Sequence, residues 1–206
     1  MMTLIEDILT VLAPIGAAIA FLIGLRKYSK GQNWLKARFM LSMIESFEKD
    51  KKINMACKML DWDERDLDFS EGKTLHIDNK MLVSALRVVR MDIESNEQPD
   101  QITARTTFTK EESCVRDAFD TFFDFFDRLY ALEKSGLLSF SDLWYFYYWF
   151  ELLCHVGEHK KDPTIQKAFD NYIVAYNFVG LRKFIEKYKK DSKARVDYEI
   201  HYDLKC

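Results

Sequence analysis

The pattern of apolar and charged residues divides the chain into an uncharged opening segment and a longer amphipathic part. The 18 residues from Ile8 to Leu25 carry no charge. A helix that crosses a bilayer needs about 20 mainly apolar residues, and Leu4 and Ile5 extend the segment to that length. We therefore expect a single N-terminal transmembrane helix, and the alternative is a buried helix of a soluble protein.

The charges that flank this segment predict its orientation. Acidic Glu6 and Asp7 precede it, whereas a cleaved export signal begins with basic residues. The positive-inside rule places the basic flank, and with it the rest of the chain, in the cytoplasm and the N-terminus outside. We expect the first basic residues also to contact anionic lipid. The basic residues before the first acidic one, Glu45, are Arg26, Lys27, Lys30, Lys36 and Arg38.

Small residues recur along one face of the expected membrane helix. Gly16, Ala20 and Gly24 are spaced by four, and Ala13 and Ala17 form a second such row. Small residues at this spacing let two helix backbones approach closely in lipid. We expect a homo-oligomer that forms through Gly16, Ala20 and Gly24. The alternative is that glycine and alanine are simply common in membrane helices.

The remaining chain shows the apolar spacing of amphipathic helices. The first carries the stripe Leu35, Phe39, Met43 and Phe47, and the last helical region is interrupted at Gly180. Capping residues and closing glycines support the boundaries, notably Asp78, Thr109 with Glu112, and Gly136. The predicted helices are 32–47, 53–60, 78–89, 109–136 and 139–155, followed by a helical region that begins at Pro163.

One short stretch has the alternation of strands instead. Leu67 and Phe69, then Leu75 and Ile77, alternate with polar residues on either side of a glycine-containing turn. The predicted fold is therefore mainly α, with a single N-terminal transmembrane helix, a helical bundle and one small β-hairpin. We divide it into a membrane anchor with a basic exit, a helical cytoplasmic domain and a charged tail, at 1–30, 31–190 and 191–206.

A run of six aromatic residues, from Tyr145 to Phe150, leaves no purely polar side on its helix. Such a helix is normally central to a bundle. A second membrane span is the alternative, but Glu151 limits the apolar run to about eleven residues, which is too short to cross.

Composition excludes several classes of protein. The net charge of −3 argues against a protein that binds long polyanions, so no specific nucleic acid is expected. The four cysteines are widely spaced and form no CxxC pair, which argues against a disulfide framework or a zinc knuckle. Reduced thiols in a cytoplasmic domain fit this spacing better.

Two acidic clusters resemble metal sites in composition, but neither has the residue spacing of a known metal-binding motif. Asp61, Asp63, Asp66 and Asp68 lack the glycine and glutamate positions of a calcium-binding EF-hand, so we interpret them as turn-capping residues. A second set lies along the predicted helix 109–136, without the Glu-x-x-His pairs of di-iron bundles. We expect this set to form a solvated face or to dock basic residues; its members are Asp117, Asp120, Asp124 and Asp127.

No catalytic signature for a nucleophile, phosphate loop or metal stands in the sequence, and we predict neither enzymatic activity nor a cofactor. His155 and His159 are spaced as in a zincin helix, but the glutamate, Glu158, does not follow the first histidine. A frayed polar helix end that includes Glu151 is the preferred interpretation, and an enzyme with an unusual metal site is the weakest alternative.

The strongest remaining polar feature is RKFIEKYKKDSKAR, residues 182–195, with seven basic and two acidic residues. Arg182, Lys183 and Lys187 could contact anionic lipid, RNA or a small nucleotide ligand. The alternative is that they solubilise a helix end, because cations near a helix C-terminus are favoured by the helix dipole.

The chain resembles a family of uncharacterised bacterial proteins that are small, N-terminally membrane-anchored and all-helical in their cytoplasmic domain. The resemblance rests on the anchor and its exit, then MLDWDERDLDF, SALR, VRDAFDTFFDFFDRL and SFSDLWYFYYWFELL. It implies a single-pass protein of the bacterial inner membrane and carries over no functional residue. Some small anchored helical proteins act in phage defence or stress signalling, which is an analogy of architecture.

These observations lead to two functional hypotheses. The first is a membrane-anchored, non-enzymatic interaction protein that self-associates through its membrane helix and binds a protein or small ligand with its cytoplasmic bundle, in bacterial defence or stress signalling. The alternative is an effector that perturbs the membrane when the cytoplasmic domain senses infection or a ligand.

Overall fold

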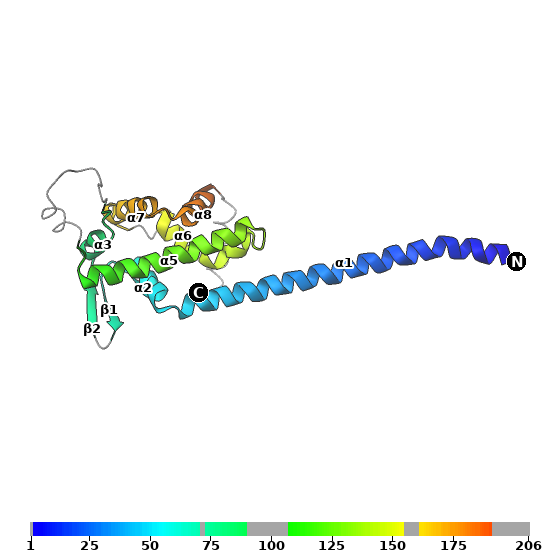
Figure 1. Ribbon diagram of the computed structural model, residues 1–206, viewed down its shortest axis with the longest axis horizontal. Helices are drawn as coiled ribbons and strands as arrows, with labels where there is room; N and C mark the ends of the chain where they lie inside the picture. Colours follow the sequence, from blue (N-terminus) through cyan, green and yellow to red (C-terminus); the bar gives the residue numbers. More distant parts are fainter. Residues whose placement is uncertain (1, 71–72, 90–106, 155–160, 191–206) are drawn as a thin grey trace. The chain divides into compact units, whose positions relative to one another are not determined.

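The computed structural model describes residues 2–70, 73–89, 107–154 and 161–190, and the side chains of these ranges apart from 2–18, 69–70 and 73 (Figure 1). The chain divides into two compact units, Met1–Met43 and Ile44–Cys206. We describe each by itself. The described residues are mainly helical with one two-stranded hairpin, as the sequence predicts.

The first unit is formed by helix α1 (Met2–Lys49), whose last turn belongs to the second unit. Separate helices for the opening segment and for residues 32–47 were expected, but α1 is continuous. Gly31 does not break it, because a helix tolerates one exposed glycine at a cost of about 1 kcal/mol. The expected stripe is also incomplete: Phe47 is buried, whereas Leu35 is 54% exposed.

The opening apolar segment falls mostly on residues 2–18, whose side chains lie outside the described set. Among the residues that the structure describes, no helix is long and apolar enough to span a bilayer.

After the last turn of α1, the second unit continues with a helix, a hairpin and a short helix, and an aspartate caps each of the two helices. Helix α2 (Lys51–Asp61) starts after Asp50, which accepts hydrogen bonds from two backbone amides. Strands β1 (Arg65–Ser70) and β2 (Lys73–Ile77) pair antiparallel, with Leu67 opposite Leu75, so the predicted hairpin is confirmed. Asp78 caps α3 (Asn79–Ala85) through the Met81 amide at 2.7 Å. Helix α3 is shorter than predicted, ending at Ala85.

The longest helix of this unit is α5 (Lys110–Lys134), which packs against α2, α3 and α8 (Figure 1). Its capping box of Thr109 and Glu112 is confirmed, and Gly136 follows its end with a φ of 77°. The aromatic run forms η1 (Phe140–Phe146) and α6 (Tyr147–Cys154). The Phe150 ring lies 5.1 Å from the Phe126 ring of α5, which confirms that the run is central.

The last two helices, α7 (Pro163–Ala175) and α8 (Val179–Lys190), correct the prediction of a break at Gly180. The chain turns at Asn177 instead, which has a φ of 59°, a conformation that asparagine tolerates better than most residues. Gly180 lies inside α8, where a Cβ would stand 2.7 Å from the Tyr130 Cβ of α5. Glycine is therefore required there by close packing of two helices and not by the turn.

Candidate functional site

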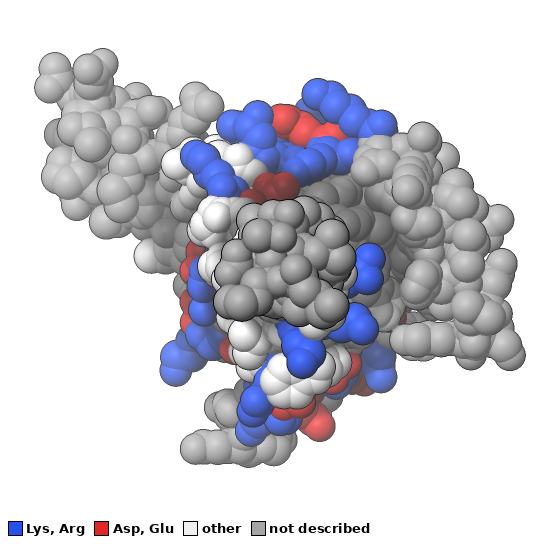
Figure 2. All heavy atoms as spheres, turned by 90° about the vertical axis from the view of Figure 1, so that its right-hand side faces the viewer, with Lys and Arg blue, Asp and Glu red and all other residues white. Residues whose placement is uncertain are grey.

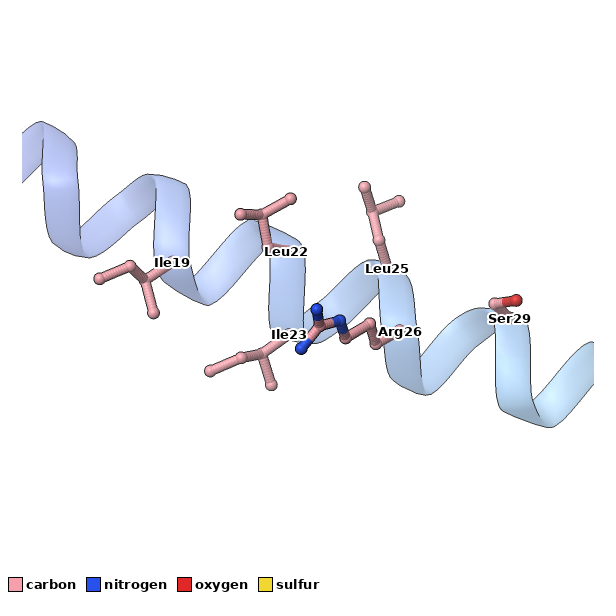
Figure 3. A pocket seen from close by; sticks show the side chains of 6 residues that line it. All are labelled: Ile19, Leu22, Ile23, Leu25, Arg26 and Ser29. Carbon is pink, nitrogen blue, oxygen red and sulfur yellow. The ribbon is translucent and has the colours of Figure 1, made fainter.

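The boundary between apolar and basic residues on α1 is the first candidate site. Figure 3 shows Leu22 and Leu25 projecting above the helix in that view and Ile19 and Ile23 below it, with the Arg26 guanidinium turned back beside Ile23. These side chains belong to one helix, so they bound an open surface and not an enclosed cavity. Arg26, Lys27 and Lys30 are all exposed there.

The small-residue row lies on the same helix. Gly16, Ala20 and Gly24 share a face because α1 is continuous through all three and side chains four apart are neighbours on a helix. The surroundings of Gly16 lie outside the described set, whereas Ala20 is exposed. A Cβ at Gly24 would meet nothing within 4 Å. Along its described residues, this face is therefore open.

The other predicted basic residues lie on α8. Arg182, Lys183 and Lys187 are exposed on it. Lys183 Nζ lies 3.0 Å from the Glu186 carboxylate, and Lys187 pairs with Glu133 of α5. Figure 2 shows Lys and Arg side chains, with a few acidic ones, along the upper edge of the folded unit, where Figure 1 has α8. The predicted basic residues thus form two groups on two different units.

The last turn of α1 is held inside the folded unit by an aromatic cluster. The Phe47 ring centroid lies 4.9 Å from that of Phe125 and 5.2 Å from that of Phe146. The next residue, Glu48, accepts a hydrogen bond from the Tyr145 hydroxyl. Burial and the adjacent Glu48 carboxylate raise the pKa of Tyr145 above its ordinary value, so this hydroxyl remains a donor at neutral pH. Phe47 was expected in a stripe, but its partners were not.

A cluster of arginines and aromatic rings joins the end of α3 to the start of α5, and sequence reasoning missed it. Arg87 Nη1 lies 2.5 Å from the Glu112 carboxylate, whose side chain is 9% exposed. The hydrogen bond from Arg87, with another from Ser84, lowers the pKa of Glu112 to about 2. Two guanidinium groups contact the Phe108 ring. The Arg87 guanidinium carbon lies 4.2 Å from the ring centroid, and that of Arg116 lies 4.1 Å from it.

Arg116 extends the cluster to α7. Its guanidinium lies 4.8 Å from the Tyr172 ring centre and donates a hydrogen bond of 2.7 Å to the Ala85 carbonyl. The Tyr172 hydroxyl donates to Asp120 at 2.6 Å, and burial raises the pKa of that carboxyl. SALR and VRDAFD, two stretches that carry the resemblance, therefore meet here. The described contacts engage both guanidinium groups with partners inside the protein, so the cluster fastens three helices together.

The aspartates along α5 correct the expectation of a solvated face, and one of them, Asp117, fits the alternative that the set docks basic residues. Asp120 bonds Tyr172 of α7, and Asp127 accepts from the Leu181 amide at 2.9 Å, which caps α8. Asp117 pairs with Lys52 of α2 at 3.3 Å. Asp124 is exposed, and its carboxylate makes no such contact in the described structure. Most of this set therefore joins helices.

The other acidic cluster also has partners instead of the turn-capping role that was expected. Asp66 bonds His76 at 2.8 Å and Asp68 bonds Thr74 at 3.0 Å, both across the hairpin. Asp63 pairs at 3.0 Å with Lys161, a buried cation, and Asp61 accepts from the Tyr148 hydroxyl. Each of the four carboxylates therefore has a partner within the described residues.

The remaining candidates for metal chemistry lie partly outside the described residues, including His155, Glu158 and His159. Within the described ranges, no group of three or more His, Cys, Asp or Glu side chains could hold a metal ion. Cys57, Cys114 and Cys154 form no disulfide within the described ranges, and burial raises the pKa of Cys57 above its ordinary value. No protein-family model, curated protein or solved structure matches this chain.

Proposed function

We propose that the protein is a membrane-anchored, non-enzymatic interaction protein that self-associates through α1. In this proposal the N-terminal part of α1 crosses the bacterial inner membrane once, with its N-terminus outside and the folded unit in the cytoplasm. The observation that carries it is the surface of α1, where exposed apolar side chains up to Leu25 give way at Arg26 to exposed basic ones.

The exposure of this apolar surface supports a hydrophobic environment for it. Phe21 is 66% exposed, and Leu22 and Ile23 beside it are also mostly exposed. Removing one such side chain from water is worth about 1.5–3 kcal/mol. A contiguous apolar surface of this kind marks a membrane or protein contact, whereas isolated exposed apolar residues need no explanation. The basic residues that follow match the headgroup layer.

The row of small residues Gly16, Ala20 and Gly24 supports self-association. Two copies of α1 could approach closely along it, because no side chain larger than a methyl group projects from these three positions. The resulting oligomer would bring several folded units together at the membrane, which suits a scaffold or signalling role in bacterial defence or stress.

A second function, a membrane-perturbing effector, is favoured by one observation. Helix α1 is continuous from its apolar end to Phe47, which lies within the aromatic core of the folded unit. A ligand or infection signal that repacks the core around Phe47 would therefore act on the last turn of the helix whose other end carries the membrane segment.

Extraction and crosslinking test the first function. Full-length protein should remain in vesicles washed with alkaline carbonate, and it should crosslink as an oligomer in native membranes. Replacing Gly16, Ala20 and Gly24 with Ile should abolish the oligomer, whereas Ala18→Ile, about 120–160° away around the helix, should leave it intact. A chain that washes off the vesicles refutes the anchor, and equal crosslinking of both variants refutes the interface.

Toxicity on overexpression separates the two functions. An effector should damage the membrane, and the triple Ile variant should abolish that damage while Ala18→Ile retains it. If cells that overexpress the protein grow normally while the oligomer forms, the effector hypothesis is refuted and the interaction-protein hypothesis stands.

A further inference from the structure

The exposed face of α8 is strongly basic. The buried side chains of α8 are Leu181, Phe184, Ile185 and Tyr188, which pack into the core. The polar side carries five cations and one anion, a net charge of +4 in a chain whose total is −3. Because the whole chain is acidic, this concentration of positive charge on one helix calls for a reason.

Contacts within the protein neutralise only part of this face. Lys183 pairs with Glu186, and Lys187 pairs with Glu133. No carboxylate within the described ranges forms an ion pair with the other three cations, Arg182, Lys189 and Lys190. All three are exposed.

Helix stability explains the cations at only one end of α8. Lys189 and Lys190 lie in the last turn, where the negative end of the helix dipole favours them. Arg182 and Lys183 lie close to the N-terminus, where the dipole disfavours positive charge. Asp127 of α5 accepts from the Leu181 amide and supplies the anionic cap that the helix itself lacks. The two N-terminal cations therefore work against the helix that carries them.

We propose that this face of α8 docks on the anionic headgroups of a bilayer. The inference rests on the proposed function, because α1 would hold the folded unit near the membrane. Phe47 lies 21 positions after Arg26, or about 32 Å along the helix, which limits how far the folded unit can move from the headgroups. Tethering makes the contact effectively intramolecular, so a few lysines suffice.

The chemistry of the face favours lipid phosphate over nucleic acid. Proteins that hold single strands combine a positive groove with exposed rings on which bases stack. The aromatic residues of α8, Phe184 and Tyr188, are buried in the core. A row of cations on a helix that exposes no ring of its own matches a headgroup surface, which offers charge and no bases.

Lysine acetylation of the full-length protein in vesicles tests the proposal. The vesicles contain phosphatidylcholine alone or with phosphatidylglycerol, and mass spectrometry follows Lys189 and Lys190, with the exposed Lys167 of α7 as the reference. Phosphatidylglycerol should slow acetylation of the two lysines by about fivefold relative to Lys167, and high salt should restore it. Equal rates in both vesicles would overturn the proposal, as would protection by added RNA but not by the anionic vesicles.

Charge-reversal variants provide the matched control. Lys189→Glu with Lys190→Glu should remove the protection of Lys183 by phosphatidylglycerol, whereas Lys51→Glu with Lys58→Glu, two exposed lysines of α2, should preserve it. Equal protection in both variants would contradict a contact through α8. A parallel carbonate wash reports on the anchor separately. If the protein washes off in carbonate but phosphatidylglycerol still protects Lys183 at neutral pH, the lipid contact of α8 is supported and the proposed anchor is refuted.

Discussion

The Phe47 and Phe125 rings lie 4.9 Å apart, centroid to centroid, and join the last turn of α1 to the longest helix of the folded unit. Phe146 lies 5.2 Å from the same Phe47 ring, from the segment that follows α5. Phe47 is therefore part of the core, whereas Leu35, twelve residues earlier on the same helix, is 54% exposed.

Replacing Phe47 with Ala should destabilise the folded unit by about 3–5 kcal/mol, because it removes a buried ring and leaves a cavity among aromatic side chains. Chemical denaturation of the full-length protein in detergent, followed by tryptophan fluorescence, measures the change. The matched control is Leu35→Ala, twelve residues earlier on the same helix and exposed, which should change the stability by less than about 0.5 kcal/mol. Similar losses in both variants would show that Phe47 is not part of the core in solution.

Replacing Gly180 with Ala should lower the stability by about 1–3 kcal/mol, because the new Cβ would lie 2.8 Å from the Asp127 Cα and must push α8 away from α5. Gly31→Ala is the control, since a Cβ there meets nothing within 4 Å. Gly31→Ala should be neutral or stabilise α1 by about 0.5–1 kcal/mol, because alanine is the better helix former. Thermal melts of both variants suffice, and an unchanged Gly180→Ala melt would contradict the close approach.

Replacing Glu112 with Gln should cost about 2 kcal/mol, because the carboxylate accepts from Arg87 and caps α5. The exposed Glu111→Gln change should cost little. The pKa of Glu112 is lowered from 4.5 to about 2, so its contribution is fully present above 4.5 and is lost as pH falls toward 2. Urea titrations across this range should show a shallower pH dependence for Glu112→Gln than for the wild type. Identical slopes would contradict the ion pair.

His76 should titrate above its ordinary pKa, because Asp66 accepts a hydrogen bond from its ring and stabilises the imidazolium. The contribution of this pair to stability is then present below pH 6.5 and is lost as pH rises through the folded pKa. NMR titration of the ring protons measures the pKa directly. Asp66→Asn should lower it, while Asp68→Asn, whose carboxylate bonds Thr74, should change it less. A pKa that Asp66→Asn leaves unchanged would contradict the contact.

Local signals in the sequence predicted most of the secondary structure of the folded unit. The hairpin around Leu67 and Leu75, the Asp78 cap, and the end of α5 at Gly136 all depend on residues a few positions apart. The break between α7 and α8 was misplaced, because glycine is the stronger general signal for a helix break than asparagine. Gly180 is explained by α5, which lies about fifty residues earlier in the chain.

The polar clusters depended on contacts that no local pattern encodes. Arg87 and Glu112 are 25 residues apart, and Asp120 and Tyr172 are 52 apart. A charged residue at a helix surface looks the same in sequence whether it faces water or a neighbouring helix. The sequence alone therefore could not distinguish the exposed Asp124 from the half-buried Asp120 on the same helix.

By itself the sequence determined the helical character, the hairpin and the caps, because backbone hydrogen bonding and apolar spacing act over one or two turns. Only the tertiary structure decided that α1 is continuous into the core at Phe47, that α8 presents its cations outward, and that Arg116 joins three helices. Those features depend on which distant side chains meet, and that is decided when the helices pack.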